Sequence, residues 1–146
     1  MSGKHTPFEV SEADVAFEAA WRAAWEAYFA GQPGMLMGLA ADDIVYEMHG
    51  DPALMRMTGR WEGKDGVAEA LGMIAEDFAP QTMNVIDVQA QAGCLTTWFE
   101  NAWVHRASGK TLQVANLIVW RYADGQVYRL DEYIRTSELK RAFGAL

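Results

Sequence analysis

Residues 95–134 read LTTWFENAWVHRASGKTLQVANLIVWRYADGQVYRLDEYI, and this stretch decides the fold. Apolar and polar side chains alternate along most of it, as they do in strands that bury one face. Turn-forming pairs interrupt the alternation at Ser108 with Gly109 and at Asp124 with Gly125. Together with the segment that precedes it, the stretch predicts four antiparallel strands, at about 82–92, 94–106, 111–122 and 126–135.

The turns also predict how these strands are aligned. With the first turn at the tip of its hairpin, Asn101 lies opposite Asn116. The second turn is compatible with two alignments: a two-residue loop places Glu132 opposite Leu117, and a three-residue loop places it opposite Asn116. We favour the three-residue loop, in which Gly125 supplies the left-handed residue of a bulged turn.

Under this alignment one face of the predicted sheet is almost wholly apolar, and three polar side chains interrupt it in a row. The row consists of Asn101, Asn116 and Glu132, on three neighbouring strands. Directly opposed side chains lie about 4.5–5.5 Å apart, so we expect these three to reach one another or a shared ligand. The apolar residues of this face are Phe99, Trp103, Leu112, Val114, Ile118, Trp120, Tyr128, Leu130 and Ile134.

A carboxyl group among apolar side chains indicates acid–base chemistry. Burial disfavours the charged form and raises the pKa of Glu132, whereas amide donors to the ionised form lower it again. The two effects together can produce a general acid or base that works near neutral pH. The same three residues could instead form a satisfied polar network that only fixes strand register.

The residues before the strands predict helices. Ser11 and Asp14 form a capping box that begins a long amphipathic helix, and Gly31 ends it. The connection at 49–63 is too apolar for a solvated loop, so we expect it to fold over part of the molecule. Helices followed by antiparallel strands predict the α+β class, with helices on one face of the sheet. The other predicted elements are a short helix at 34–41, a strand at 44–48, a helix at 67–78 closed by Pro80 and a last helix at 137–143.

Composition limits the classes of protein that the chain can belong to. It has 146 residues, 51% of them hydrophobic, and a formal charge of −8, which disfavours nucleic acid as a partner. We expect a flexible tail at 1–10 and a single domain at 11–146. Apolar runs are too short for a membrane span or a secretory leader, so we expect a cytoplasmic protein. With Cys94 as the only cysteine, and histidines that lack ligand spacing, we predict no metal site.

Three segments of the chain resemble the NTF2-like superfamily, and in particular its SnoaL-like members. They are LAADDIVYEMHG, TGRWEGKDGVAEAL and GQVYRLDEYIRTSELKRAF, and with the order of elements the likeness covers about residues 10–143. The resemblance implies a cone-shaped barrel, in which long N-terminal helices and a curved, mostly antiparallel sheet enclose a pocket. It also implies a homodimer, for which the half-apolar outer face of the sheet is suited.

The chain resembles the enzymes of this superfamily unequally. Met48 stands where steroid isomerases carry a carboxylate base. Limonene-epoxide hydrolases use two carboxylates and an arginine, and the matching positions in this chain are Asn101, Phe99 and Glu132. Tyr46 is similar to the tyrosine that positions water in those enzymes. Polyketide cyclases of the SnoaL type use one carboxyl group as acid and base, and Glu132 resembles that group. Cyclase chemistry is therefore the nearest match.

These observations predict a cofactor-free enzyme that moves protons on an apolar ring compound, as a cyclase, isomerase or dehydratase does. Glu132 would carry the proton, Asn101 and Asn116 would steady negative charge on a carbonyl oxygen, and Tyr46 would donate a further hydrogen bond. The alternatives are a non-catalytic ligand-binding or dimeric interaction domain, and an epoxide hydrolase with an altered catalytic set. The predicted ligand-binding residues are Trp21, Trp25, Tyr28, Met48, Trp61, Phe99, Trp103, Val114 and Ile118.

Two histidines are secondary candidates for proton transfer. His49 follows the first predicted strand at the expected rim of the pocket. His105 falls on the inner face, near the open end of its strand.

Overall fold

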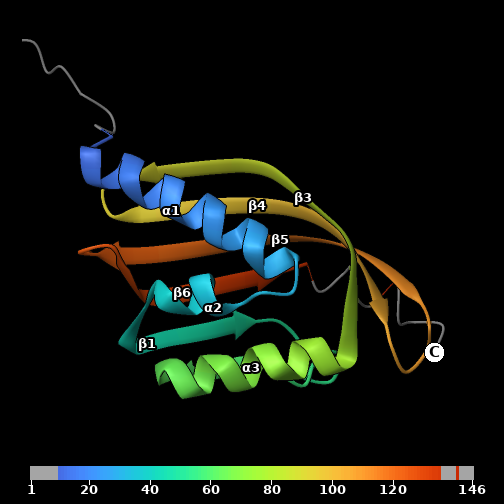
Figure 1. Cartoon of the computed structure of the whole chain (residues 1–146). Coiled ribbons are helices and arrows are strands. Elements are labelled where there is room, and N and C mark those ends of the chain that lie inside the picture. Colours follow the sequence, from blue (N-terminus) through green and yellow to red (C-terminus); the bar gives the residue numbers. More distant parts are fainter. Residues whose placement is uncertain (1–9, 136–140, 142–146) are drawn as a thin grey trace, which may run out of the picture.

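The computed structural model describes residues 10–135 and 141 of the chain. Within that part, a curved sheet of six strands packs against three helices (Figure 1). The helices are α1 (Glu12–Phe29), α2 (Gly34–Gly38) and α3 (Gly63–Asp77). The strands are β1 (Ala40–His49), β2 (Gly59–Glu62), β3 (Phe78–Gln91), β4 (Cys94–His105), β5 (Thr111–Ala123) and β6 (Gln126–Ile134).

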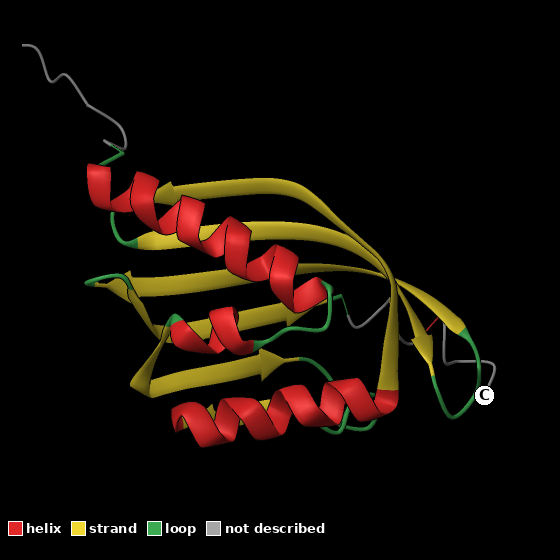
Figure 2. Cartoon of the chain, in the orientation of Figure 1, coloured by secondary structure: helices red, strands yellow, loops and turns green. Residues whose placement is uncertain are grey.

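The three helices cover one face of the sheet, which confirms the predicted α+β class (Figure 2). The strand order is β2-β1-β6-β5-β4-β3, in which β1 and β6 run parallel and the other neighbours run antiparallel. β3 leaves the end of α3, bends, and continues beside α1, so the sheet curls around the helices without closing (Figure 1). In the described part of the chain, no helix is long and apolar enough to cross a membrane.

Aromatic side chains hold α1 against the sheet. Phe17 and Trp21 recur at helical spacing on the buried side of the helix. Phe17 stacks on Tyr122 of β5 with 3.8 Å between ring centroids, and Trp21 meets Trp120 edge-on at 5.7 Å. These contacts place α1 over β5, the middle one of the three strands that carry the predicted polar row.

The N-terminal end of α1 is tied to the sheet by Asp14, which is only 2% exposed. Asp14 and Ser11 form the capping box that the sequence predicts. The same carboxylate accepts hydrogen bonds from the Tyr122 hydroxyl and, at 3.1 Å each, from the backbone N–H groups of Ala92 and Gly93 in the β3–β4 turn. The Tyr122 hydroxyl, aided by Ser11 and Gly93, outweighs the effect of burial and holds the pKa of Asp14 well below its usual range.

The predicted alignment of β4 and β5 is wrong by two residues. Asn101 lies opposite Val114, and Asn116 lies opposite Phe99. The cause is the position of Gly109, whose φ of 70° makes it the left-handed residue that ends the turn rather than a residue at its tip. The turn is therefore centred one residue earlier than the sequence pattern suggests.

The predicted three-residue loop between β5 and β6 is also wrong. Asp124 and Gly125 both have positive φ, at 52° and 74°, and form a two-residue turn. A bulge next to this turn then shifts the register, so that Glu132 lies opposite Ile118. Tyr128 falls at the bulge and is 46% exposed, which contradicts its predicted place on the inner face.

Other differences concern elements or pairings that were not predicted and the ends of helices. The strand β2 was not predicted, because four residues are too few to establish an alternating pattern. The parallel pairing of β1 with β6 was not predicted either. Pro80 lies at an irregularity within β3, where a missing N–H is tolerated, instead of closing a helix. The short helix predicted at 34–41 ends at Gly38. Residues 1–9 of the predicted tail and nearly all of the predicted helix at 137–143 lie outside the described residues.

We expect Asp14→Asn to lower the free energy of unfolding by about 2–4 kcal/mol, because the amide cannot accept all the hydrogen bonds that the carboxylate receives. The loss is measured by denaturant unfolding at neutral pH. The lowered pKa means that ionised Asp14 stabilises the fold above the ordinary carboxyl range and less as the pH falls below it, so the variant should also lose part of its sensitivity to acid. Glu12→Gln, at an exposed position of the same helical turn, is the control and should cost less than about 0.5 kcal/mol. Equal stability of the two variants would contradict the role of Asp14.

Candidate functional site

A cavity of about 120 Å³ lies between the inner face of the sheet and the helices. A volume of this order accommodates a single small ring. Among the described residues that line it, the side chains with amide or carboxyl groups are Asn101, Asn116 and Glu132. The hydroxyl-bearing Tyr28 and Tyr46 also line it, and most of the remaining wall is aliphatic, aromatic or thioether surface.

Four of the polar side chains form one hydrogen-bonded chain across β1, β6, β5 and β4. The Tyr46 hydroxyl donates to Glu132 Oε1 at 2.6 Å, and Asn116 Nδ2 donates to Glu132 Oε2 at 2.9 Å. Asn101 Nδ2 donates to Asn116 Oδ1, also at 2.9 Å. We call Tyr46, Glu132, Asn116 and Asn101 the polar relay.

The relay forms although none of its antiparallel pairs is directly opposed. An error of two residues in register keeps every side chain on its original face, because side chains alternate with a period of two. Asn101 and Asn116 are therefore diagonal neighbours, as are Asn116 and Glu132, and their side chains are long enough to bridge the diagonal. Tyr46 reaches Glu132 from the parallel neighbour β1, where Met48 stands directly beside Glu132.

The direction of the hydrogen bonds in the relay follows from the carboxylate. An ionised carboxylate accepts only, so Asn116 must turn its amide nitrogen toward Glu132. The Asn116 oxygen then faces Asn101, which must turn its own nitrogen toward Asn116. Each amide nitrogen keeps one further hydrogen for a substrate oxygen, and the Asn101 Oδ1 is left without a donor among the described residues.

Burial raises the pKa of Glu132, and the hydrogen bonds from Tyr46 and Asn116 lower it in part without cancelling the effect. Burial also raises the pKa of Tyr28 to about 12, with a further contribution from the negative charge of Glu132. The pKa of Tyr46 lies well above its usual range, because the residue is buried and donates to that same carboxylate. Both tyrosines therefore stay protonated at neutral pH, whereas Glu132 can exchange a proton in a higher pH range than a solvated glutamate.

The structure distributes the predicted ligand-binding residues between the cavity and the core. Trp25, Tyr28, Met48, Trp103, Val114 and Ile118 line the cavity. Trp21 and Phe99 are at most 1% exposed and pack behind the lining in the hydrophobic core. Trp61 lies in β2 and donates from its indole nitrogen to the Met57 carbonyl, in the loop before that strand, at 2.8 Å. It is not among the lining residues.

Sequence reasoning missed several residues of the cavity wall. Leu112, Trp120, Leu130 and Ile134 were predicted for the inner face of the sheet, but not as ligand-binding residues. For part of the others the signal was the excess of Met and Leu in segments that otherwise read as loop or short helix, together with the apolar side of α3. The additional lining residues are Leu36, Met37, Leu39, Ala40, Ile44, Met55, Val67, Leu71, Ile74, Phe78, Met83, Leu112, Trp120, Val127, Leu130 and Ile134.

Neither of the two histidines lines the cavity. His105 is the last residue of β4, and its Nδ1 lies 2.7 Å from the Ser108 hydroxyl. His49 is still within β1 but on the outer face of the sheet, so its predicted place at the pocket rim is wrong. The reason is that β1 extends to His49, one residue beyond the predicted end, and alternation turns that residue away from Met48.

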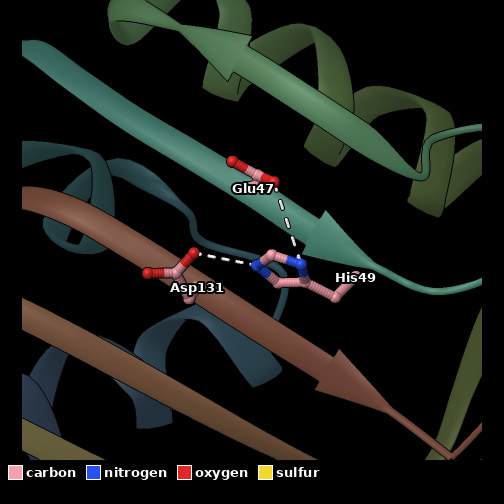
Figure 3. Close-up of side chains that lie close together, drawn as sticks. All are labelled: Glu47, His49 and Asp131. Carbon is pink, nitrogen blue, oxygen red and sulfur yellow. Dashed lines mark hydrogen bonds and ion pairs between the residues drawn. The ribbon is translucent and has the colours of Figure 1, made fainter.

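On the outer face His49 contacts two carboxylates (Figure 3). Its Nε2 lies 2.9 Å from Asp131 of β6 and its Nδ1 lies 3.8 Å from Glu47, and these groups could together hold a metal ion. Arg121 and Arg129 each donate to Asp131 at 2.9 Å, and Arg129 also reaches Glu47 at 3.1 Å. These two guanidinium groups supply the positive charge that a cation would otherwise bring, so the cluster is an ion-pair network. The absence of a metal site stays a prediction.

Comparisons with known proteins agree with this architecture. A model of the SnoaL-like domain matches residues 19–130. An NTF2-like protein of unknown function from Burkholderia pseudomallei K96243 is 14% identical with a TM-score of 0.78, over 86% of this chain and 95% of that one. No curated protein sequence matches the chain significantly.

Two other solved structures are similar and have functional names that are themselves proposals. One is named as an isomerase from Rhodopseudomonas palustris, with 16% identity and a TM-score of 0.76 over 88% of this chain and 96% of that one. The other is named as a polyketide cyclase from Xanthomonas campestris pv. campestris, with 16% identity and a TM-score of 0.77 over 90% and 98%. At these identities the likeness establishes the fold.

We expect Tyr46→Phe to raise the pKa of Glu132 further, because the hydroxyl that stabilises its ionised form is lost. The carboxyl carbon resonance of Glu132, followed by NMR against pH, measures this shift. Tyr28→Phe is the matched control: no described hydrogen bond joins Tyr28 to Glu132, so the pKa of Glu132 should stay near its value in the unaltered protein. An unchanged or lower pKa in Tyr46→Phe would contradict the arrangement of the relay.

Proposed function

This chain belongs to the SnoaL-like domain family, and we propose that it is a cofactor-free enzyme that catalyses proton transfer on a small apolar ring compound. The reaction would be of the isomerase, cyclase or dehydratase type, with Glu132 as the group that takes up and returns the proton. The observation that carries the proposal is a carboxyl group of raised pKa, hydrogen-bonded on both oxygens, in the wall of an otherwise mainly apolar cavity.

The surroundings of Glu132 suit this role. A general base works best when its pKa lies near the working pH, and burial moves Glu132 in that direction. Tyr46 and Asn116 hold both carboxylate oxygens, so the group is oriented before a substrate binds. The second hydrogens of the two asparagine amides could then stabilise negative charge that develops on a substrate oxygen.

The names of the similar structures support the class of reaction, because two of those proteins are named as a proposed isomerase and a proposed polyketide cyclase. A further solved structure, TerC, was co-crystallised with polyporic acid; it is 12% identical, with a TM-score of 0.76. The alternative is a binding protein in which the relay only orients its ligand. The role of Glu132 in turnover separates the two functions.

Isomerisation of cyclohex-3-enone to cyclohex-2-enone is a direct test. The reaction breaks a C2–H bond and forms a C4–H bond, so one carboxyl group can take the proton and return it without another reactant. We expect catalysis whose kcat/KM rises with pH as Glu132 ionises, and a loss of about 10²–10⁴-fold in Glu132→Gln. Absorbance of the conjugated product measures the rate.

Glu100→Gln is the matched control, because this glutamate is exposed on the outer face of β4, and its activity should equal that of the unaltered protein. Turnover that survives in Glu132→Gln would contradict the proposed base. Binding of cyclohex-3-enone by the unaltered protein without any catalysis would favour the binding protein.

We also propose that two copies of the chain pair through the outer face of the sheet. The support is an apolar row across three strands on that face, in which Leu117 lies opposite both Trp98 and the 45% exposed Tyr133. We expect light scattering to give twice the mass of one chain, and Leu117→Glu to give a single-chain mass. Val15→Glu, at an exposed position on the helical side, should remain paired; a single-chain mass for the unaltered protein would refute the dimer.

A further inference from the structure

The polar relay ends at an atom without a partner. Asn101 is 6% exposed and lines the cavity, and its Oδ1 has no hydrogen-bond partner among the described residues. Its Nδ2 donates a hydrogen bond to Asn116 Oδ1, so the side-chain oxygen of Asn101 points away from Asn116. A buried carbonyl oxygen without a donor is unfavourable, and a ligand that brings an O–H or N–H group to this point would relieve the cost.

Ionisation of Glu132 decides which atom of Asn101 is left over. While the carboxylate only accepts, both amides must point their nitrogens along the relay toward it, and the Asn101 oxygen remains. A proton on Glu132 Oε2 turns that oxygen into a donor, and Asn116 can then present its own oxygen to it. Both side-chain amides then rotate by about 180°. Asn116 donates to the Asn101 oxygen, and the Asn101 nitrogen becomes the atom without a partner.

We propose that Asn101 adjusts the preference for ligands by hydrogen-bond polarity. Ionisation of Glu132 leaves the Asn101 oxygen without a donor and raises the affinity for an apolar ring that carries a hydroxyl or N–H group, whereas protonation of Glu132 frees a second hydrogen on the Asn101 nitrogen and raises the affinity for a ring that carries an acceptor. The inference deepens the proposed function and rests on it for the place of the ligand. The proposal makes Asn101 a specificity-determining residue, because its orientation depends on the protonation state of Glu132, to which two successive hydrogen bonds connect it.

The proton on Glu132 has one favoured position. The Tyr46 hydroxyl donates to Oε1 at 2.6 Å and makes no other hydrogen bond among the described residues, so a proton on Oε1 would remove the acceptor that this hydroxyl uses. The proton therefore goes to Oε2, which faces Asn116. The titratable groups of the described residues that interact with Glu132 are Tyr46 on β1 and Tyr28 on α1, and both stay neutral over the range in which Glu132 titrates.

Three probes that share a para-fluorinated ring test the selection by fluorine NMR. They are 4-fluorophenol, which carries a donor; 4-fluoroacetophenone, which carries only an acceptor; and 4-fluorotoluene, which carries neither. The readout is the ratio of the Kd values of the first two, so differences in ring burial cancel when the ratio is compared between conditions. The affinity for 4-fluorotoluene shows whether the cavity itself is intact.

In the unaltered protein, the ratio should favour the phenol about two pH units above the pKa of Glu132 and shift toward the ketone about two units below it. A buried hydrogen bond made or lost at Asn101 corresponds to a shift of about tenfold in that ratio. Toluene binding should be equal at both pH values. A ratio that is independent of pH would overturn the proposal.

Glu132→Gln tests the same mechanism without titration. Its Oε1 must accept from Tyr46, so its amide nitrogen faces Asn116 and holds the relay in the reversed direction. The variant should prefer the ketone at every pH, by about tenfold relative to the ionised protein. Asn101→Leu should bind 4-fluorotoluene as well as the unaltered protein does and show the same ratio at both pH values.

The outcomes separate this inference from the proposed function. If Glu132→Gln abolishes isomerisation of cyclohex-3-enone but leaves the ratio of Kd values unchanged, the polarity selection is wrong and the proposed function stands. If the ratio shifts as expected while turnover does not depend on Glu132, the selection stands and the proposed enzyme is wrong.

Discussion

A single carboxyl group in a mainly apolar wall constrains the rest of the site. Glu132 cannot remain ionised among aromatic and aliphatic side chains without donors, and Tyr46 and Asn116 provide one for each oxygen. Asn116 then needs a donor of its own, which Asn101 supplies. The orientation of each amide in the relay thus follows from the negative charge of Glu132. The last group of the relay, the Asn101 Oδ1, has no hydrogen-bond donor among the described residues.

The relay depends on a fold that keeps α1 over the inner face without filling the space beneath it. Asp14 ties the first turn of α1 to the β3–β4 turn and to Tyr122, and Phe17 and Trp21 pack it against β5. The far end of the helix places Trp25 and Tyr28 in the cavity wall. Curvature of the sheet supplies the rest of the space, since β3 starts beside α3 and ends beside the start of α1 (Figure 1).

The sequence predicts the faces of this structure better than its alignments. The alternation of side chains placed Asn101, Asn116 and Glu132 on one face, and an error of two residues in register preserves that outcome. What the pattern could not provide was turn geometry, because Gly109 and Gly125 permit more than one loop and a bulge at Tyr128 leaves no distinct signal. The sequence pattern also could not distinguish residues that line the cavity from residues of the hydrophobic core. Phe99 and Trp103 lie on the same face of the same strand, but of these two only Trp103 lines the cavity.

The relay also couples the ligand to the proton in both directions. If a donor on the ligand is favoured while Glu132 is ionised, then by linkage the binding of that ligand must lower the pKa of Glu132, and an acceptor ligand must raise it. A ligand that brings a hydroxyl group therefore stabilises the ionised form of Glu132, which is the form that a general base needs. A ligand whose oxygen only accepts favours the protonated form, which is the form present after Glu132 has taken up a proton. The same hydrogen-bonded chain that orients the carboxylate thus makes its proton affinity depend on the hydrogen-bonding groups of the bound ligand.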